Sequence, residues 1–243
     1  MTILIAGASG ATGRLLLDQL LNLGHKVKII VRSTQNISKT ILENENLTVV
    51  EGSILELTDE KLVKTVNGCD AIASCLGHMP NMSGLFGQPR KLVTETTRRL
   101  CHAVKANKPS NKIKYVLMNT AGNSNRDLSE KISFGQKIVI ALLRLLLPPH
   151  VDNENAADYL RVEINQNDNF MQWVVIRPDK LINESAVSEY NLYPSPIRSA
   201  LFDAGKTSRI NVANFMVRLI ADNELWEKWQ GQMPVIYNEE IVS

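Results

Sequence analysis

Three glycines near the N-terminus, Gly7, Gly10 and Gly13, have the type and spacing that most directly predict chemistry in this sequence. They follow the apolar run 3–6 and precede a leucine-rich segment with helical periodicity. In a strand–turn–helix unit, the first glycine permits the sharp turn and the second lets the backbone approach a pyrophosphate. The third lets helix and strand pack closely. Because the first turn of a helix offers unpaired N–H groups to phosphate, we expect a dinucleotide to bind here.

The end of the second predicted strand, 25–32, indicates which dinucleotide binds. NAD-binding domains commonly carry an acidic residue at this place, where it accepts the ribose hydroxyls. Here the place holds Arg32. A guanidinium binds a 2′-phosphate in a charge-assisted, bidentate way, so we expect NADP(H). Arg14 is a candidate second cation, and the alternative is that both arginines are ordinary solvated surface residues.

The remaining elements alternate between strand-like and helix-like segments, which predicts an α/β fold with a doubly wound parallel sheet, the Rossmann fold. The expected strands cover 3–6, 25–32, 47–52, 70–77, 115–122 and 173–178, with a short terminal strand at 235–237. The expected later helices cover 37–42, 58–68, 90–106, 138–147 and 155–164, with another from about 212. We expect one domain over 1–243, in which a small C-terminal lobe, 183–211, forms the substrate side of the cleft.

Residues at the strand exits complete the expected cleft. Gly77 would let the backbone approach the nicotinamide ribose, or it would serve as a plain turn. Asn119 and Thr120 emerge at the carboxyl edge, where the substrate is expected. The irregular segment 78–89 is either a mobile lid or a surface loop.

Composition narrows the class of protein. A formal charge of +2 gives no argument for nucleic acid or an anionic membrane as partner. The longest apolar stretch, 138–147, contains Arg144 and is too short to span a bilayer. Three cysteines without metal spacing indicate reduced thiols in a cytoplasmic protein with no metal site. Among them Cys75, near the expected cleft, is interpreted as a packing residue rather than a catalytic thiol.

Taken together, these motifs resemble the atypical short-chain dehydrogenase/reductase superfamily, in particular NmrA-like regulators and biliverdin/flavin reductases. The resemblance rests on the glycine turn, on Arg32, and on segments 76–77, 119–122, 159–161, 173–181 and 208–213. It implies that the pyrophosphate is held by Gly7, Ser9, Gly10, Ala11, Thr12 and Gly13. It further implies that Ser53 and Ile54 flank adenine, although relatives often have Asp at the place of Ser53.

The resemblance also implies roles on the nicotinamide side of the cleft. Leu76 and Gly77 would pass beside the ribose, and Pro178 and Leu181 would face the nicotinamide. Asn119 is assigned to the cofactor, and Thr120 is placed where relatives carry a hydroxyl that polarises the substrate.

The sequence departs from the superfamily in its acid–base residues. Classical members use a Tyr and a Lys four residues later, the lysine lowering the pKa of the phenol. None of the five tyrosines is followed by Lys at that spacing, and the positions of the pair fall near Pro149 and Asn153. Protonation would then come from solvent, from His150, from Thr120 through water, or from Tyr159.

Two functions fit these observations. The first is an NADPH-dependent reductase of a small flavin, quinone or tetrapyrrole substrate. The second is a non-catalytic NADP(H) sensor that reports to a protein partner. An epimerase of sugar nucleotides ranks last, because it needs the missing Tyr and Lys.

Overall fold

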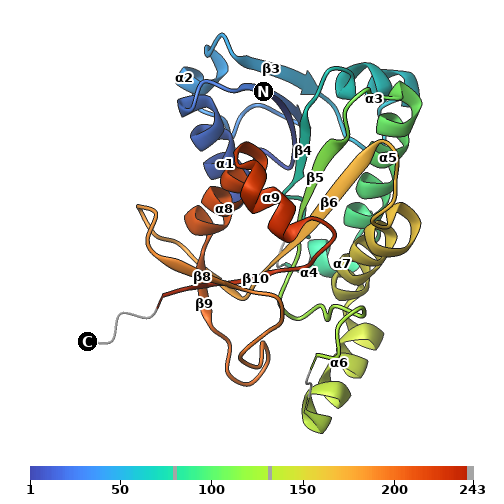
Figure 1. Cartoon of the computed structure of the whole chain (residues 1–243), viewed down its shortest axis with the longest axis vertical. Helices are drawn as coiled ribbons and strands as arrows, with labels where there is room; N and C mark the ends of the chain where they lie inside the picture. Colours follow the sequence, from blue (N-terminus) through green and yellow to red (C-terminus); the bar gives the residue numbers. More distant parts are fainter. Residues whose placement is uncertain (79–80, 131–132, 240–243) are drawn as a thin grey trace.

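The computed structural model describes residues 1–78, 81–130 and 133–239, and within them eight strands form one sheet (Figure 1). The strand order is β3–β2–β1–β4–β5–β6–β10–β8, and a separate two-stranded sheet pairs β7 with β9. The strands are β1 (Thr2–Ala6), β2 (Lys26–Val31), β3 (Leu47–Glu51), β4 (Ala71–Ser74), β5 (Ile113–Met118), β6 (Met171–Pro178), β7 (Lys180–Ile182), β8 (Tyr190–Tyr193), β9 (Lys206–Ser208) and β10 (Val235–Asn238). All pairs are parallel except β10 with β8. The predicted Rossmann fold is confirmed.

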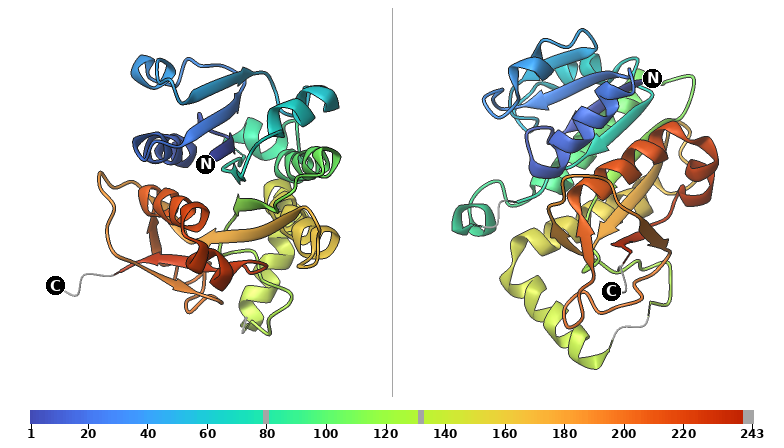
Figure 2. Two further views of the ribbon diagram at one scale, coloured as in Figure 1. Left: turned by 45° about the horizontal axis from the view of Figure 1, so that its top comes forward. Right: turned by 90° about the vertical axis from the view of Figure 1, so that its left-hand side faces the viewer.

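Helices cover both faces of the sheet (Figure 2). They are α1 (Ala11–Asn22), α2 (Lys39–Leu42), α3 (Asp59–Val66), α4 (Met82–Phe86), α5 (Leu92–Asn107), α6 (Phe134–Leu146), α7 (Pro148–Asp158), α8 (Arg209–Ala221) and α9 (Asn223–Trp229), and a π-helix continues α7 over Tyr159–Ile164. Within the part of the chain described, no helix is both long and apolar enough to cross a membrane.

Alternation along the strands divides the core into two. Ile3 and Ile5 of β1 pack with α1, α8 and α9, whereas Leu4 and Ala6 pack with α3, α5 and α7 on the opposite face. Successive side chains of a strand point to opposite faces, so a strand buried on both sides is apolar throughout. The predicted apolar stripe of α8, which includes Phe215 and Met216, is fully buried, as expected of core.

The register of the sheet brings the predicted site residues to one edge. Ala6 at the end of β1 pairs with Ile30 on one side and with Ser74 on the other. Further across the sheet, Ser74 of β4 pairs with Leu117 of β5, and Met118 of β5 pairs with Ile176 of β6. The chain order reverses between β1 and β4, which is where open α/β sheets bind their ligands, outside the carboxyl ends of the strands.

Several segments differ from the sequence predictions. Pro148 and Pro149 follow the end of α6, as the predicted helix end at 147 required, but they also begin α7, seven residues before the predicted start at 155. Proline fits there because the first turn of a helix needs no N–H donor. The segment 78–89, expected to be irregular, contains α4, while its residues 79–80 lie outside the described part. Within 183–211, β8 joins the main sheet through an antiparallel pairing with β10.

Arg177 of β6 holds the loops of the C-terminal half together. Its guanidinium is fully buried and all five of its N–H groups donate. The acceptors are the carbonyl oxygens of Met233, Asn123 and Pro194 and both carboxylate oxygens of Glu130, the shorter carboxylate contact being 2.7 Å. A buried charge is tolerated only when it is paired and hydrogen-bonded, and here both conditions are met.

Replacing Arg177 with methionine should lower the free energy of unfolding by about 3–5 kcal/mol, because the buried Glu130 would lose its counter-ion. Urea denaturation measures the change. Arg98→Met is the matched control, since Arg98 pairs with Glu95 at the surface and its loss should cost under about 1 kcal/mol. Adding Glu130→Gln to Arg177→Met should restore part of the stability. Equal small losses for the two single arginine variants would contradict this role of Arg177.

Candidate cofactor and substrate site

The glycine turn after β1 is packed too tightly for side chains. Gly7 has a φ of +86°, and a Cβ there would lie 2.9 Å from the backbone of Cys75 and Leu76 at the exit of β4. A Cβ on Gly13 would lie 2.1 Å from the Gly7 carbonyl oxygen. At Gly10 the nearest atom is that same oxygen, at 3.2 Å, and the Gly10 N–H donates to it. Gly7 and Gly13 are therefore required by packing, whereas a Cβ on Gly10 would make one tight contact, with the Gly7 carbonyl oxygen.

The first turn of α1 presents unpaired backbone donors at this edge. Gly10 is the N-cap residue and supplies no side-chain cap, and the first turn holds no acidic residue. By helix geometry the N–H groups of Ala11, Thr12 and Gly13 have no intrahelical acceptor. Ser9 is half-buried, and the Thr12 side chain is buried, so Thr12 can meet a ligand through its N–H group. This arrangement fits a phosphate group.

Two exposed arginines flank the turn. Arg32 directly follows β2, and Arg14 lies in the first turn of α1. Within the described residues, neither guanidinium forms an ion pair or a side-chain hydrogen bond. Nearby, the Thr34 hydroxyl donates to Glu51 at the end of β3, at 3.4 Å. Together with the helix N-terminus, the unpaired cations fit a dinucleotide that carries an additional phosphate.

The segment after β3 is held in place by an arginine of α5. Arg99 donates to the carbonyl oxygen of Ile54 at 2.7 Å, to that of Leu57, and to the Asp59 carboxylate. The Ile54 side chain is 7% exposed and belongs to the core, while Ser53 is half-buried at the surface. If adenine lies against this segment, Ile54 meets it mainly through its backbone.

The exit of β4 carries a histidine that the sequence analysis did not single out. Leu76 is half-buried and Gly77 is exposed, with no atom near the place of a Gly77 Cβ. The next residue, His78, lies 2.8 Å through Nε2 from the Asp152 carboxylate and 3.2 Å through Nδ1 from the Gly84 carbonyl oxygen. The sequence signal that could have identified His78 was its place as a polar residue shortly after an apolar strand.

Asp152 of α7 joins three segments. Its carboxylate accepts from His78 and from the N–H groups of Val93 and Thr94 in the first turn of α5, at 2.8 and 3.0 Å. The Thr94 hydroxyl donates back to the Asp152 carbonyl oxygen. Asp152 thus caps α5 from another helix and anchors the start of 78–89. Whether that segment closes over a ligand stays a prediction.

Thr120 and His150, the two predicted catalytic residues, flank the same glycine. A Cβ on Gly122 would lie 3.7 Å from Thr120 Oγ1 and 3.9 Å from His150 Cε1. The Gly122 N–H donates to the Thr120 hydroxyl oxygen. Asn119 fixes this corner, because its amide donates to the Asn153 carbonyl oxygen of α7 at 2.8 Å. The structure therefore brings the end of β5 and the start of α7 together.

The His150 imidazole has an acidic neighbour on its own helix. His150 Nε2 is buried without a hydrogen-bond partner and lies 3.4 Å from Glu154. Burial raises the pKa of Glu154, but the neighbouring His150 and Arg144 outweigh it and bring that pKa down to about 2. Arg144 of α6 donates to both Glu154 oxygens, at 2.8 and 2.9 Å. Glu154 is thus an ionised group that positions His150, and the sequence analysis missed it.

The remaining predicted residues lie beside β6. Pro178, the last residue of that strand, is buried, and its carbonyl oxygen accepts from the Ala121 N–H at 2.8 Å. Leu181 lies in β7, is half-buried, and packs against the core on the side of α1. Their contact with nicotinamide stays a prediction.

Two alternative reactive residues are unsuited to chemistry. The Cys75 thiol is buried 3.7 Å from the sulfur of Met216, and burial raises its pKa to about 12. Tyr159 packs against the core beside α5, and burial raises its pKa to about 12 as well. A nucleophilic thiol or an acid–base phenol needs a lowered pKa, so both residues are interpreted as packing residues.

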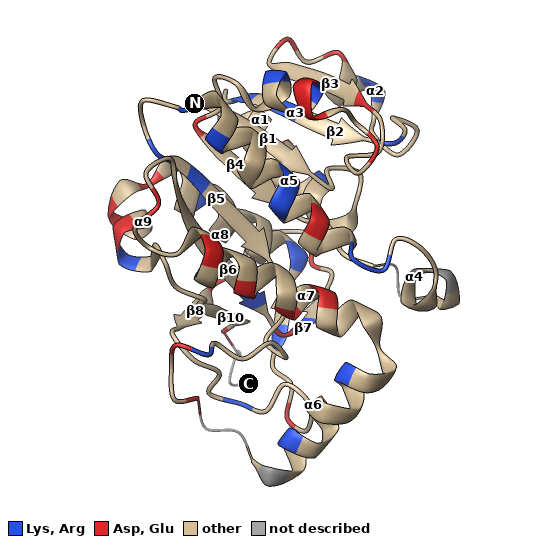
Figure 3. Cartoon of the chain, turned by 90° about the vertical axis from the view of Figure 1, so that its right-hand side faces the viewer, with Lys and Arg blue, Asp and Glu red and all other residues tan. Residues whose placement is uncertain are grey.

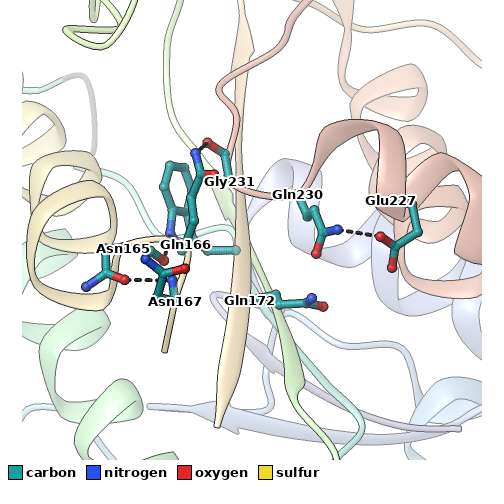
Figure 4. Close-up of a pocket in the computed structure, with 8 residues that line it drawn as sticks. Asn165, Gln166, Asn167, Gln172, Glu227, Gln230 and Gly231 are labelled. Atoms are coloured by element: carbon teal, nitrogen blue, oxygen red, sulfur yellow. Dashed lines mark hydrogen bonds between the residues drawn. The ribbon is translucent and has the colours of Figure 1, made fainter. Parts of the chain in front are cut away.

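A surface cleft of about 420 Å³ lies elsewhere, near the start of β6 and the end of α9 (Figure 4). Its lining residues are Asn165, Gln166, Asn167, Gln172, Trp173, Glu227, Gln230 and Gly231. Met171, the first residue of β6, pairs with the first residue of β5, so this cleft lies at the amino end of the strands. None of the predicted site residues lines it.

A comparison of the sequence with profiles of known protein families identifies the family of this chain. The profile of the NAD(P)H-binding family matches residues 7–223, which is most of the chain. The chain belongs to the NAD(P)H-binding family. In this family member the matched region starts at Gly7, the first glycine of the turn, and continues into α9. A search of curated proteins gave no match.

Solved structures share the fold of this NAD(P)H-binding protein. A short-chain dehydrogenase/reductase from Veillonella parvula, in complex with NADP, has 18% identity over 98% of this chain and 94% of its own, with a TM-score of 0.69. A putative NADH-flavin reductase from Streptococcus pneumoniae has 15% identity, covers 98% and 100%, and has a TM-score of 0.66. ChuY, an anaerobilin reductase from Escherichia coli O157:H7, has 14% identity over 100% of both chains, with a TM-score of 0.69. These structures confirm the expected Rossmann fold, and the family profile confirms the expected NAD(P)H-binding family.

Replacing Gly10 with valine should abolish binding of NADPH and NADH alike while the fold is retained, because the side chain would occupy the space before the α1 N-terminus. Calorimetric titration measures the affinities. Gly13→Ala is the matched comparison, since its Cβ would clash with the Gly7 carbonyl and lower the thermal stability. Unchanged affinity in Gly10→Val would show that the turn does not hold phosphate.

Replacing Arg32 with alanine should weaken NADPH binding and leave NADH binding nearly unchanged. Loss of a charge-assisted contact to phosphate costs about 1.5–3 kcal/mol, which is roughly 10- to 150-fold in affinity. Titration by protein fluorescence measures both constants, with Arg98→Ala as a surface control. An equal loss for both nucleotides would contradict the assignment of Arg32 to the 2′-phosphate.

Proposed function

We propose that this protein is an NADPH-dependent reductase of a small aromatic or carbonyl substrate of the flavin, quinone or tetrapyrrole type. The observation that carries the proposal is the meeting of Thr120 and His150 at Gly122, on the sheet edge that also holds the glycine turn. The preference for NADPH over NADH is supported by Arg32 and Arg14, the unpaired guanidiniums beside that turn.

The assigned residues divide the work of binding. The N–H groups of Ala11, Thr12 and Gly13 would hold the pyrophosphate, and Arg32 would hold the 2′-phosphate. Ser53 and the backbone of Ile54 would lie against adenine. Leu76, Gly77, Asn119, Pro178 and Leu181 would bound the ribose and nicotinamide. When bound, NADPH supplies the hydride, so the chain itself needs to orient the two reactants and move one proton.

The proton would come from the corner between β5 and α7. His150 Nε2 is buried and faces the Glu154 carboxylate, so the imidazole would pass a proton to the substrate from its other ring nitrogen or through water. The Glu154 carboxylate, 3.4 Å away, positions the imidazole, and Arg144 holds Glu154 from α6. The Thr120 hydroxyl, at the exit of β5, would polarise the substrate oxygen or relay a proton through water.

The substrate side would be formed by 183–211. This segment includes β8 and β9, and Ser199 within it contacts the Gln136 side chain of α6 at 3.2 Å. Arg177 of β6 binds the carbonyl oxygen of Pro194 in this segment.

Since Cys69, Cys75 and Cys101 are unpaired and buried, we place the protein in the reducing cytoplasm.

A non-catalytic NADP(H) sensor is the second candidate, favoured by the absence of Tyr-x-x-x-Lys. At the corresponding positions, Pro149 lies in the first turn of α7, and the Asn153 carbonyl oxygen accepts from Asn119. An assay of NADPH oxidation separates the two candidates. The loss of NADPH absorbance is measured with flavins, quinones or tetrapyrroles added as substrates. Turnover of any of these supports the reductase. NADPH-selective binding without turnover supports the sensor, and capture of a protein partner then becomes the next step.

In the reductase, His150→Gln should lower kcat about 100-fold or more, the usual contribution of a positioned acid or base, while NADPH affinity is retained. Thr120→Val should also lower turnover without loss of affinity. Steady-state kinetics with the best substrate, together with NADPH titration, measures both effects. His102→Gln on the exposed face of α5 is the matched control. Wild-type turnover in either site variant would remove that residue from the mechanism.

A further inference from the structure

Two helices carry apolar side chains that nothing in the described chain covers. On α6, Ile138, Leu142, Leu145 and Leu146 are 48%, 50%, 79% and 60% exposed. Their spacing places them on one stripe of the helix, because residues three, four and seven apart share a face. The opposite stripe includes the buried Ile140. The rest of the described chain therefore covers only one side of α6.

The short helix α4 extends this apolar surface. Met82 and Phe86, one turn apart, are 73% and 44% exposed. Figures 2 and 3 show α4 and α6 projecting from the same side of the molecule, with α7 between them. We name the six exposed side chains of α4 and α6, together with the cations described next, the α4–α6 face.

Cations lie among these side chains. Arg90, Lys91 and Arg144 line a cleft of about 280 Å³ together with Leu145 and the buried Asp152, and Lys137 is exposed on α6. Arg90, Lys91 and Lys137 form no ion pair within the described part of the chain. The stretches 82–91 and 133–151, which supply the whole face, contain no Asp or Glu. The face is therefore apolar and carries three cations, Arg90, Lys91 and Lys137, without an acidic partner among the described residues, whereas Arg144 is paired with Glu154.

We propose that the α4–α6 face docks on the surface of an anionic lipid bilayer. The leucines would enter the boundary between headgroups and acyl chains, as the apolar face of an interfacial helix does. The unpaired cations Arg90, Lys91 and Lys137 would meet anionic headgroups. This contact is peripheral and uses no spanning segment, and it departs from the sequence-based expectation of no membrane partner.

Charge and shape favour a bilayer over a second copy of the chain. A two-fold dimer places the same patch on both subunits, so it would bring the unpaired Arg90, Lys91 and Lys137 of one copy towards those of the other. Figure 3 also shows α4 and α6 standing out from the body of the molecule, whereas a protein partner for an amphipathic helix usually supplies a groove. Exposed leucines beside unpaired cations suit a fluid, anionic surface.

Sedimentation with vesicles tests the proposal. The full chain is mixed with vesicles of phosphatidylcholine alone or with added phosphatidylglycerol. Wild type should bind the anionic vesicles, and Leu145→Ser/Leu146→Ser should weaken binding about tenfold per leucine. Arg90→Gln/Lys91→Gln should weaken it about fivefold per cation and reduce the effect of added salt. Unchanged thermal unfolding verifies that the variants are folded.

Matched controls are available elsewhere on the surface. Leu23→Ser removes a leucine that is 60% exposed at the end of α1, and Lys61→Gln/Lys64→Gln removes two exposed cations of α3. Both should bind as wild type does. The proposal is overturned if wild type does not bind anionic vesicles, or if the leucine variant binds them as wild type does. It is also overturned if light scattering finds a dimer that the leucine substitutions dissociate, which would assign the face to a second copy.

Discussion

The exclusion of side chains from the first turn sets the geometry of the whole ligand edge. A Cβ at Gly13 would overlap the Gly7 carbonyl oxygen, and one at Gly7 would press on the backbone of Cys75 and Leu76. Because these contacts are between backbones, α1 can begin directly over the end of β1, with the exit of β4 beside it. The unpaired N–H groups of α1 and the ends of β4 and β5 then face the same space. A side chain at either glycine would separate them.

The arginines of this chain show two opposite uses of one side chain. Arg177 donates all five N–H groups to buried acceptors and so joins β6 to the loops at Asn123, Pro194 and Met233. Arg32, at the ligand edge, has no such partner in the described residues and remains available to a phosphate. The guanidinium that is satisfied within the fold shapes the substrate side, and the one that is not satisfied supports NADP(H) as the proposed cofactor.

The start of α7 links the site to its surroundings in several directions. Successive residues of a helix point about 100° apart, so neighbours in sequence serve different contacts. His150 faces the corner at Gly122, Asp152 caps α5 and holds His78, and Glu154 pairs with Arg144 of α6. With no Tyr-x-x-x-Lys in the chain, this helix still lies beside the exit of β5, where it places a buried imidazole.

Local patterns were sufficient for much of the fold. The glycine spacing, the apolar strands and the leucine stripe of α1 depend on neighbours within a few residues, so the Rossmann fold and its nucleotide turn could be predicted from them. The same patterns found the end of α6 before Pro148 but missed the start of α7 there, since proline both ends one helix and suits the first turn of the next. They also missed α9 and the strand β8, which is short and acquires its place by pairing with β10.

The sequence by itself determined the family, the ligand edge and the cation at Arg32, because each follows from residue types at fixed spacing along the chain. Only the tertiary structure decided which distant groups meet. His78 and Asp152 are 74 residues apart, and Arg177 and Glu130 are 47 apart. No periodicity encodes such pairs, since they arise from the packing of α7 against α5 and from the closing of loops around β6. The exposed stripe of α6 is likewise a tertiary result, because its apolar residues look like core until the fold leaves one face uncovered.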